Sequence, residues 1–507
     1  MNRYGGERFK RGLWHFGLGK VVSAISGFFA MVLVVRLLSI TAFAQYSVLI
    51  SLVEIFTAFS ALGLSHALLR YVPELYAKHY KVALREFVLN AFLIRTGALL
   101  LIVGICYLWA KPLAASIGIG NFVLGLKLYL YVVLLRTTTH FLSQVLESTL
   151  HQGYTQLAFT LSAVMRLVGM LYLSQTGNAG LIEVIWVEIW SDLLGLVIIL
   201  AGLVHVIWRV IADTETPLDD KHWLKNNLQQ IIHLAKTGYA QHIIGLPFGS
   251  NTNRLAGGYL FNNQMMASFG FAQSFYEYIK RYLPAQLLVG LIRPIVVARF
   301  SEKKDFSAAA ATCQHVVLIN MAIISAIFIL LAVGGVPILQ WISAGKYGVD
   351  ALWVLVTLML VLVLETHRLI LEMLVQTVER YAILIPSNFI LALSILPAIL
   401  LFRYLGALGF PLMNALALLF CNAWVKRKLA LEGYILKHDM RAIMQLLGLI
   451  FILSVVGLTL NTLKLHWVLS TIVVQLLFIV GVWRLFGDIF KAFLADMLGR
   501  KTDILER

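Results

Sequence analysis

Long apolar runs recur along almost the whole chain, and they constrain the fold more than any other feature. Each run has about 20 residues, the length with which an α-helix crosses a hydrocarbon core of about 30 Å. Of 507 residues, 60% are hydrophobic and only 13% charged, which is more apolar surface than a water-soluble core of this size would bury. We therefore predict an all-α polytopic membrane protein with about fourteen transmembrane helices, at 16–38, 44–67, 87–109, 122–146, 154–174, 181–207, 234–258, 264–293, 314–334, 349–373, 381–401, 405–425, 442–462 and 466–486.

The basic residues lie in alternate polar joints between these helices. The net charge is +16, and 78–85, 209–225 and 426–437 are among the joints that carry the excess of Lys and Arg. By the positive-inside rule these joints and both termini face the cytoplasm. The charge therefore follows membrane sidedness, and we expect no nucleic-acid partner.

The longest charged joint separates six predicted helices from the remaining eight. We predict an N-terminal lobe at 1–208, a cytoplasmic linker at 209–230, a C-terminal lobe at 231–430, and helices 13 and 14 with a cytoplasmic tail at 431–507. The seventh predicted helix is interrupted by Pro247 and the glycines on either side of it. Discontinuous helices of this kind often build the substrate sites of transporters.

Motifs for catalysis are missing from the sequence. It has no G-x-x-x-x-G-K-[ST] phosphate loop, no H-E-x-x-H and no G-x-S-x-G. Cys106, Cys313 and Cys421 stand far apart without C-x-x-C spacing, which favours neither a disulfide framework nor a metal site. We predict a transporter and not an enzyme, without a cofactor; whether a proton or sodium ion is coupled stays open.

Charged residues inside the predicted spans are the candidate functional residues, because each costs about 2.5–3.5 kcal/mol at the middle of a helix. Most are basic, so we predict a hydrated cationic cavity that binds an anion such as a pyrophosphate. Its predicted ligands are Lys20, Arg166, Arg254, Lys280 and Arg281. An i,i+4 pair of Glu277 with Arg281 is an alternative, and it would leave Lys280 without a partner.

Acidic residues in the spans are candidates for ion coupling or for pairing with these cations: Glu54, Glu277 and Glu365. Glu54 interrupts a stripe of small residues at helical spacing, formed by Ser47, Ser51, Ala58, Ala61 and Ser65. Close helix packing is the alternative interpretation of this stripe. We predict that Glu54 is buried and needs a partner from another helix or a proton. Glu365, Arg368 and Glu372 share one helix face and could instead neutralise one another.

Short motifs along the first twelve predicted helices resemble a known family. They are Arg36 to Tyr46, Leu62 to Glu74, Asn253 to Leu255, Trp341 to Tyr347 and Leu405 to Gly409. Together they are similar to the Wzx-like polysaccharide (oligosaccharide-lipid) flippases of the multidrug/oligosaccharidyl-lipid/polysaccharide exporter superfamily. Ser47 and Asn253 depart from the family pattern, which has glycine and an acidic residue at these positions.

The resemblance implies two six-helix lobes around a central cavity, followed by two C-terminal helices. It implies export of a polyprenyl-pyrophosphate-linked oligosaccharide from the inner leaflet of the bacterial inner membrane, with the lipid bilayer and other polysaccharide-assembly proteins as partners. An ion-coupled multidrug exporter of the same superfamily is the nearest alternative. A membrane glycan polymerase or ligase is an alternative of another class, and the short outer joints disfavour it.

Overall fold

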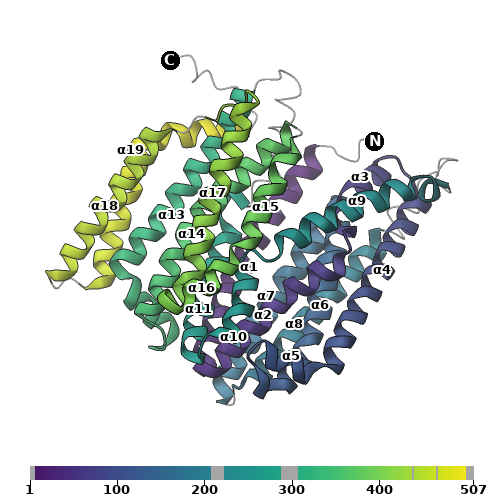
Figure 1. Ribbon diagram of the computed structural model, residues 1–507, viewed down its shortest axis with the longest axis horizontal. Helices are drawn as coiled ribbons and strands as arrows, with labels where there is room; N and C mark the ends of the chain where they lie inside the picture. Colours follow the sequence, from purple (N-terminus) through teal and green to yellow (C-terminus); the bar gives the residue numbers. More distant parts are fainter. Residues whose placement is uncertain are drawn as a thin grey trace. The chain divides into compact units, whose positions relative to one another are not determined.

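Helices make up nearly all of the regular structure. The computed structural model describes residues 6–177, 179–206, 222–286, 306–378, 380–436, 439–463 and 466–497. These residues form α-helices and short 3-10 turns, and they contain no β-strand (Figure 1). Eleven helical stretches in the described ranges are long and apolar enough to cross a membrane. The chain is an all-α integral membrane protein, as the apolar runs predict.

Contacts within the chain divide it into two units, Met1–Gly270 and Phe271–Arg507. The predicted linker at 209–230 lies largely outside the described residues, which omit 207–221. The predicted lobes at 1–208 and 231–430 and the C-terminal segment at 431–507 therefore stay a prediction.

The first unit contains ten complete helices among the described residues and the first part of an eleventh. They are α1 (Gly6–Leu37), α2 (Ile40–Ala61), α3 (Leu64–Ala77), α4 (Lys81–Leu108), α5 (Ala110–Ser116), α6 (Val123–Ser148), α7 (Gln152–Thr176), α8 (Leu181–Val204), α9 (Trp223–Gly245), α10 (Ser250–Leu260) and the start of α11 (Asn263–Tyr282). Six of the apolar stretches lie in this unit, in α1, α2, α4, α6, α7 and α8. They coincide with the first six predicted spans.

The second predicted span is shorter than expected, because α2 ends at Ala61 and α3 is a separate helix. Leu62 and Gly63 both take left-handed backbone conformations, with φ of 47° and 73°. A side chain at Gly63 would also collide with the carbonyl oxygen of Ala235 in α9, so glycine permits both the turn and the close approach. Ser65, which the sequence places on the stripe of α2, therefore belongs to α3.

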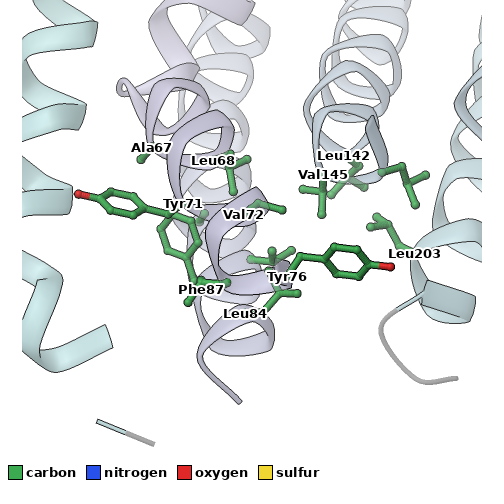
Figure 2. Close-up of a cluster of buried hydrophobic side chains, with 14 of the residues drawn as sticks. Ala67, Leu68, Tyr71, Val72, Tyr76, Leu84, Phe87, Leu142, Val145 and Leu203 are labelled. Atoms are coloured by element: carbon green, nitrogen blue, oxygen red, sulfur yellow. The ribbon is translucent and has the colours of Figure 1, made fainter. Parts of the chain in front are cut away.

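A buried apolar cluster joins α3, α4, α6, α8 and α9. Figure 2 shows part of it, with Leu68 and Val72 of α3, Leu84 of α4 and Leu142 of α6 among the packed side chains. The ring of Trp223 in α9 meets the ring of Tyr71 edge-on at 5.5 Å. The core fixes α9 against α3 and so determines which face of α9 stays exposed.

The seventh predicted span is broken, as its sequence indicates. Turn and bend residues at 246–249 separate α9 from α10, and Gly249 has a φ of 126° that side chains rarely adopt. Thr252 donates a hydrogen bond to the carbonyl of Leu246 across the break, at 2.8 Å. The predicted spans at 234–258 and 264–293 are absent from the eleven apolar stretches, since the described parts of α9 to α11 are richer in polar residues.

The second unit consists, in the described part of the chain, of the end of α11 and of α13 (Phe306–Ser343), α14 (Val349–Thr377), α15 (Leu384–Leu393), α16 (Ile395–Leu405), α17 (Gly409–Leu431), α18 (Met440–Thr462) and α19 (Trp467–Met497). One apolar stretch, Leu384–Leu431, covers α15 to α17 and includes two of the predicted spans. The helices α18 and α19, drawn in yellow in Figure 1, share an apolar core with α13.

Candidate functional site

Four charged side chains meet inside the first unit, and we call them the four-charge network. Arg136 comes from α6, Arg166 from α7, and Glu188 and Asp192 from α8. The spacing of four residues places both carboxylates on one face of α8. All four side chains are buried or partly buried, so the network lies away from bulk water.

Each arginine in the network lies close to both carboxylates. Arg136 is 2.8 Å from Asp192 and 3.4 Å from Glu188, while Arg166 is 3.1 Å from Asp192 and 3.9 Å from Glu188. Tyr46 of α2 also donates a hydrogen bond to Glu188 at 2.6 Å. Two positive and two negative charges cancel, so the predicted substrate ligand Arg166 is paired with two carboxylates in this structure.

The other predicted cation of the first lobe, Lys20, lies on α1 and is half-buried. It interacts electrostatically with Glu147 on α6. Glu188 and Asp192 are charges inside a predicted span but are not among the predicted ligands or coupling residues, and Glu147 is not predicted. The i,i+4 spacing of Glu188 and Asp192 inside an apolar helix is the signal that could have identified them.

Glu54 on α2 has a partner from another helix. Asn251 of α10 donates a hydrogen bond to its carboxylate. The side chain of Glu54 is nevertheless exposed, so the prediction that it is buried is wrong. Ser47, Ser51 and Ala58 of the same stripe are buried as expected, because they pack closely while the longer carboxylate extends beyond them.

Arg254 and Asn253 are both buried on α10, at 3% and 1% exposed. A side chain at Gly258, on the same helix, would collide with Val48 of α2. Because Asn251 and Gly258 both face α2, helical spacing places Arg254 between them on the same face. The predicted anion ligand Arg254 is therefore buried inside the first unit, on a helix that packs against α2.

Lys280 of α11 is paired, contrary to the alternative that leaves it unmatched. Its ammonium lies 2.8 Å from Oε2 of Glu365 on α14, and we call these two residues the Lys280–Glu365 pair. Tyr276 donates a hydrogen bond to the same carboxylate oxygen at 2.5 Å. The side chains of Lys280 and Glu365 are 30% and 14% exposed, so this pair is only partly buried.

Arg281 and Arg368 are the remaining basic residues of α11 and α14 for which the sequence predicts a carboxylate partner on the same helix. Arg281 is exposed. Arg368 pairs with Glu372 at 2.7 Å and also donates hydrogen bonds to Ser387 and Asn388 of α15. The predicted mutual neutralisation along α14 thus holds for Arg368 and Glu372, while Glu365 turns to α11.

No group of three or more His, Cys, Asp or Glu side chains within the described ranges has the arrangement of a metal site. The candidate groups are therefore charged side chains. The first unit contains the four-charge network and the buried Arg254, and the second unit contains the Lys280–Glu365 pair and the exposed Arg281. Such groups suit the binding and release of ions.

A family model described as polysaccharide biosynthesis protein matches residues 9–283. No curated protein sequence matches the chain. Several solved structures have a similar fold. The lipid II flippase MurJ, in an inward closed conformation, aligns with a TM-score of 0.64 at 12% identity, over 94% of this chain and 99% of that chain.

Two transporters of a second kind also align. A multidrug resistance MATE family transporter of the MOP superfamily, in an inward-facing conformation, has a TM-score of 0.64 at 13% identity, over 80% of this chain and 94% of that chain. A mutant of the Vibrio cholerae MATE transporter VcmN has a TM-score of 0.57 at 14% identity, over 84% of this chain and 97% of that chain. At such low identities the likeness shows the fold alone, which this chain shares with the lipid II flippase and the MATE transporters.

Proposed function

Because the chain belongs to the polysaccharide biosynthesis protein family, we propose that it is a secondary transporter that flips a polyprenyl-pyrophosphate-linked oligosaccharide across the membrane. The match over residues 9–283 is the observation that carries this proposal. The fold supports it, since a lipid II flippase and MATE transporters share the same arrangement of helices. The direction would be from the cytoplasmic to the outer leaflet of the bacterial inner membrane, with both termini in the cytoplasm.

Under this proposal, buried or partly hydrated cations bind the pyrophosphate. Arg254 on α10 and Lys280 and Arg281 on α11 are the proposed ligands, with Lys20 and Arg166 contributing from α1 and α7. Arg166 would do so only when its contacts with Asp192 and Glu188 loosen. Guanidinium and ammonium groups suit this role because they form charge-assisted hydrogen bonds to phosphate oxygens.

The Lys280–Glu365 pair offers a way to couple transport to an ion. While Glu365 is ionised, its carboxylate forms an ion pair with the Lys280 ammonium. Protonation of Glu365 would weaken the pair and make Lys280 available to a phosphate. We propose Glu365 as the coupling residue of the second unit, with Glu54 and Glu277 as further candidates.

Multidrug export is the second candidate function, because a MATE transporter aligns as well as the lipid II flippase does, with a TM-score of 0.64 for each. A cavity for organic cations needs carboxylates that are available to the drug. Glu188, Asp192 and Glu365 are instead engaged by arginine or lysine in this chain. This pairing favours an anionic substrate.

Reconstitution into liposomes tests the proposal. A fluorescent polyprenyl-pyrophosphate oligosaccharide in the outer leaflet should become protected from a membrane-impermeant quencher or enzyme only in vesicles that contain the protein. A cationic dye should not be transported under the same ion gradients. Transport of the dye without movement of the glycolipid would support the multidrug alternative and overturn the flippase proposal. A reporter fused after Arg507 that is active outside the cytoplasm would overturn the proposed orientation.

A further inference from the structure

The exposed face of α9 carries amides and bases but no acid. Its buried face, which includes Trp223, Ile231 and Ala235, packs against the cluster drawn in Figure 2. The opposite face is exposed and bears Gln229, Gln230, His233 and Lys236. The core of the first unit therefore presents these polar side chains outward from a fixed helix.

These side chains line one hollow along the helix. The hollow is shallow and open to the surroundings, with a volume of about 510 Å³, and Ile232 completes its lining. Positions 229, 233 and 236 are spaced by four and three residues, so they stand on one side of α9. The polar groups, with Gln230 beside them, therefore border the same space.

An ordinary solvated helix face would combine acids with bases. The neighbouring helix α3 shows that pattern, because Glu74 pairs with Arg70 at 2.9 Å and with Lys78 at 2.6 Å. In α9 the 23 residues include no Asp or Glu at all. The charge of α9 thus remains uncompensated along the helix and suits a negatively charged ligand.

The amides determine the chemical class of that ligand. A glutamine side chain offers two donors and an acceptor, and a sugar hydroxyl both donates and accepts. Adjacent amides therefore match the hydroxyl groups of a carbohydrate, while Lys236 matches an acidic group such as a phosphate.

We propose that the hollow along α9 holds the sugar residues of the transported glycolipid, with Gln229 and Gln230 hydrogen-bonded to hydroxyl groups and Lys236 facing an acidic group. This inference rests on the proposed flippase function and adds a headgroup subsite to it. The subsite is distinct from the proposed pyrophosphate ligands on α10 and α11.

Binding measurements with two lipids test the subsite. The purified protein in nanodiscs is titrated with a polyprenyl-pyrophosphate oligosaccharide and with bare polyprenyl pyrophosphate. The double variant Gln229→Ala/Gln230→Ala should bind the glycolipid about tenfold more weakly, because two hydrogen bonds are lost, and the bare lipid with unchanged affinity. Lys236→Gln should weaken glycolipid binding as well.

Matched controls keep the result specific. Gln175→Ala removes an exposed glutamine from α7, and Lys111→Gln removes an exposed lysine from α5; both should bind the glycolipid as the unaltered protein does. Thermal unfolding verifies that the α9 variants are folded, and single substitutions at Gln229 and Gln230 replace the double variant if it is not.

Two outcomes would overturn the subsite. One is unchanged glycolipid binding in the folded α9 variants; the other is an equal loss for both lipids, which would indicate that α9 contacts only phosphate or membrane headgroups. Failure of the unaltered protein to bind or move the glycolipid would instead overturn the proposed function, so the two failures are distinguishable.

Discussion

The four-charge network of the first unit and the Lys280–Glu365 pair of the second unit show two ways to place charge inside a membrane protein. In the network, each arginine lies within 4 Å of two carboxylates, and the Glu188 side chain is only 2% exposed. In the pair, one ammonium meets one carboxylate, and the Lys280 side chain is 30% exposed. The network joins three helices through four ion pairs, whereas the pair joins α11 and α14 through one ion pair and the hydrogen bond from Tyr276.

This difference suggests different roles. Removing one member of a buried network leaves an uncompensated charge in a medium of low dielectric constant, so the network resists change. A partly hydrated pair can exchange its partner for water, a proton or an anion at a smaller cost. We therefore expect the network to support the structure of the first unit and the pair to take part in transport.

The largest expected effect is on stability. Arg136→Ala should lower the free energy of unfolding by about 3–5 kcal/mol, because Asp192 and Glu188 would lose their closest cation. Thermal unfolding in detergent measures this change. A variant that melts like the unaltered protein would show that the network is not structural and would remove the contrast between the two regions.

The second effect is on transport. Lys280→Ala should reduce glycolipid flipping by about tenfold or more, through loss of a charge-assisted contact, with a much smaller fall in melting temperature than Arg136→Ala. The reconstituted flipping assay and thermal unfolding measure the two quantities on the same preparation. Equal destabilisation by both substitutions would mean that the pair is as structural as the network.

A third prediction concerns the proton. Glu365→Gln keeps the shape of the side chain and its capacity to accept from Tyr276, but it removes the ionised form. Flipping by the unaltered protein should respond to a pH gradient, and flipping by this variant should not. A response to the gradient that persists unchanged in Glu365→Gln would exclude this residue as the coupling group, and dependence on sodium alone would do the same.

A smaller and more graded effect is expected at Arg281, which is exposed and follows Lys280 in the sequence. Arg281→Ala should impair flipping while protein abundance stays intact, and Arg281→Lys should restore part of the rate if charge matters more than bidentate geometry. Assays in vesicles with matched protein content measure this series. Full activity of Arg281→Ala in well-expressed protein would contradict its assignment to the anion site.

The smallest effect is expected on the surface of α3. The hydrogen bond from Lys78 and, to a lesser extent, the charge of Arg70 hold the pKa of Glu74 below its ordinary value of 4.5. A carboxyl whose pKa is lowered on folding stabilises the protein above its unfolded pKa, and that contribution is lost as the pH falls through the folded pKa. Glu74→Gln should therefore lower the melting temperature slightly at neutral pH, and the difference should disappear as the pH falls below 4.5 and through the folded pKa. A large change at either pH would contradict the view that exposed pairs contribute little.

Much of the fold follows from the sequence because a membrane helix has a local signature. The first six predicted spans and the break at Pro247 correspond to helices and turns of the structure. The exact end of α2 could not be predicted from hydropathy, since Leu62 and Gly63 continue an apolar run. The turn there depends on the close approach of Ala235 from a helix more than 150 residues away in the sequence.

The candidate site was predictable only in its residue types. A run of apolar residues that contains Lys or Arg identifies a charge that must be compensated, because an unpaired charge in lipid is costly. The identity of the partner is a long-range property. Glu365 is separated from Lys280 by more than 80 residues, and Asn251 from Glu54 by almost 200, so no spacing along one helix could reveal these contacts.

The sequence by itself determined that the chain is a helical membrane protein, which charges lie within it, and which family it resembles. These properties depend on composition and on periods of a few residues, which the bilayer converts directly into helices. Only the tertiary structure decided that Arg166 and Lys280 are paired, that Glu54 is exposed, and that the amides of α9 face outward. These properties depend on helix packing, because the helix that compensates a charge or covers a face comes from a distant part of the chain.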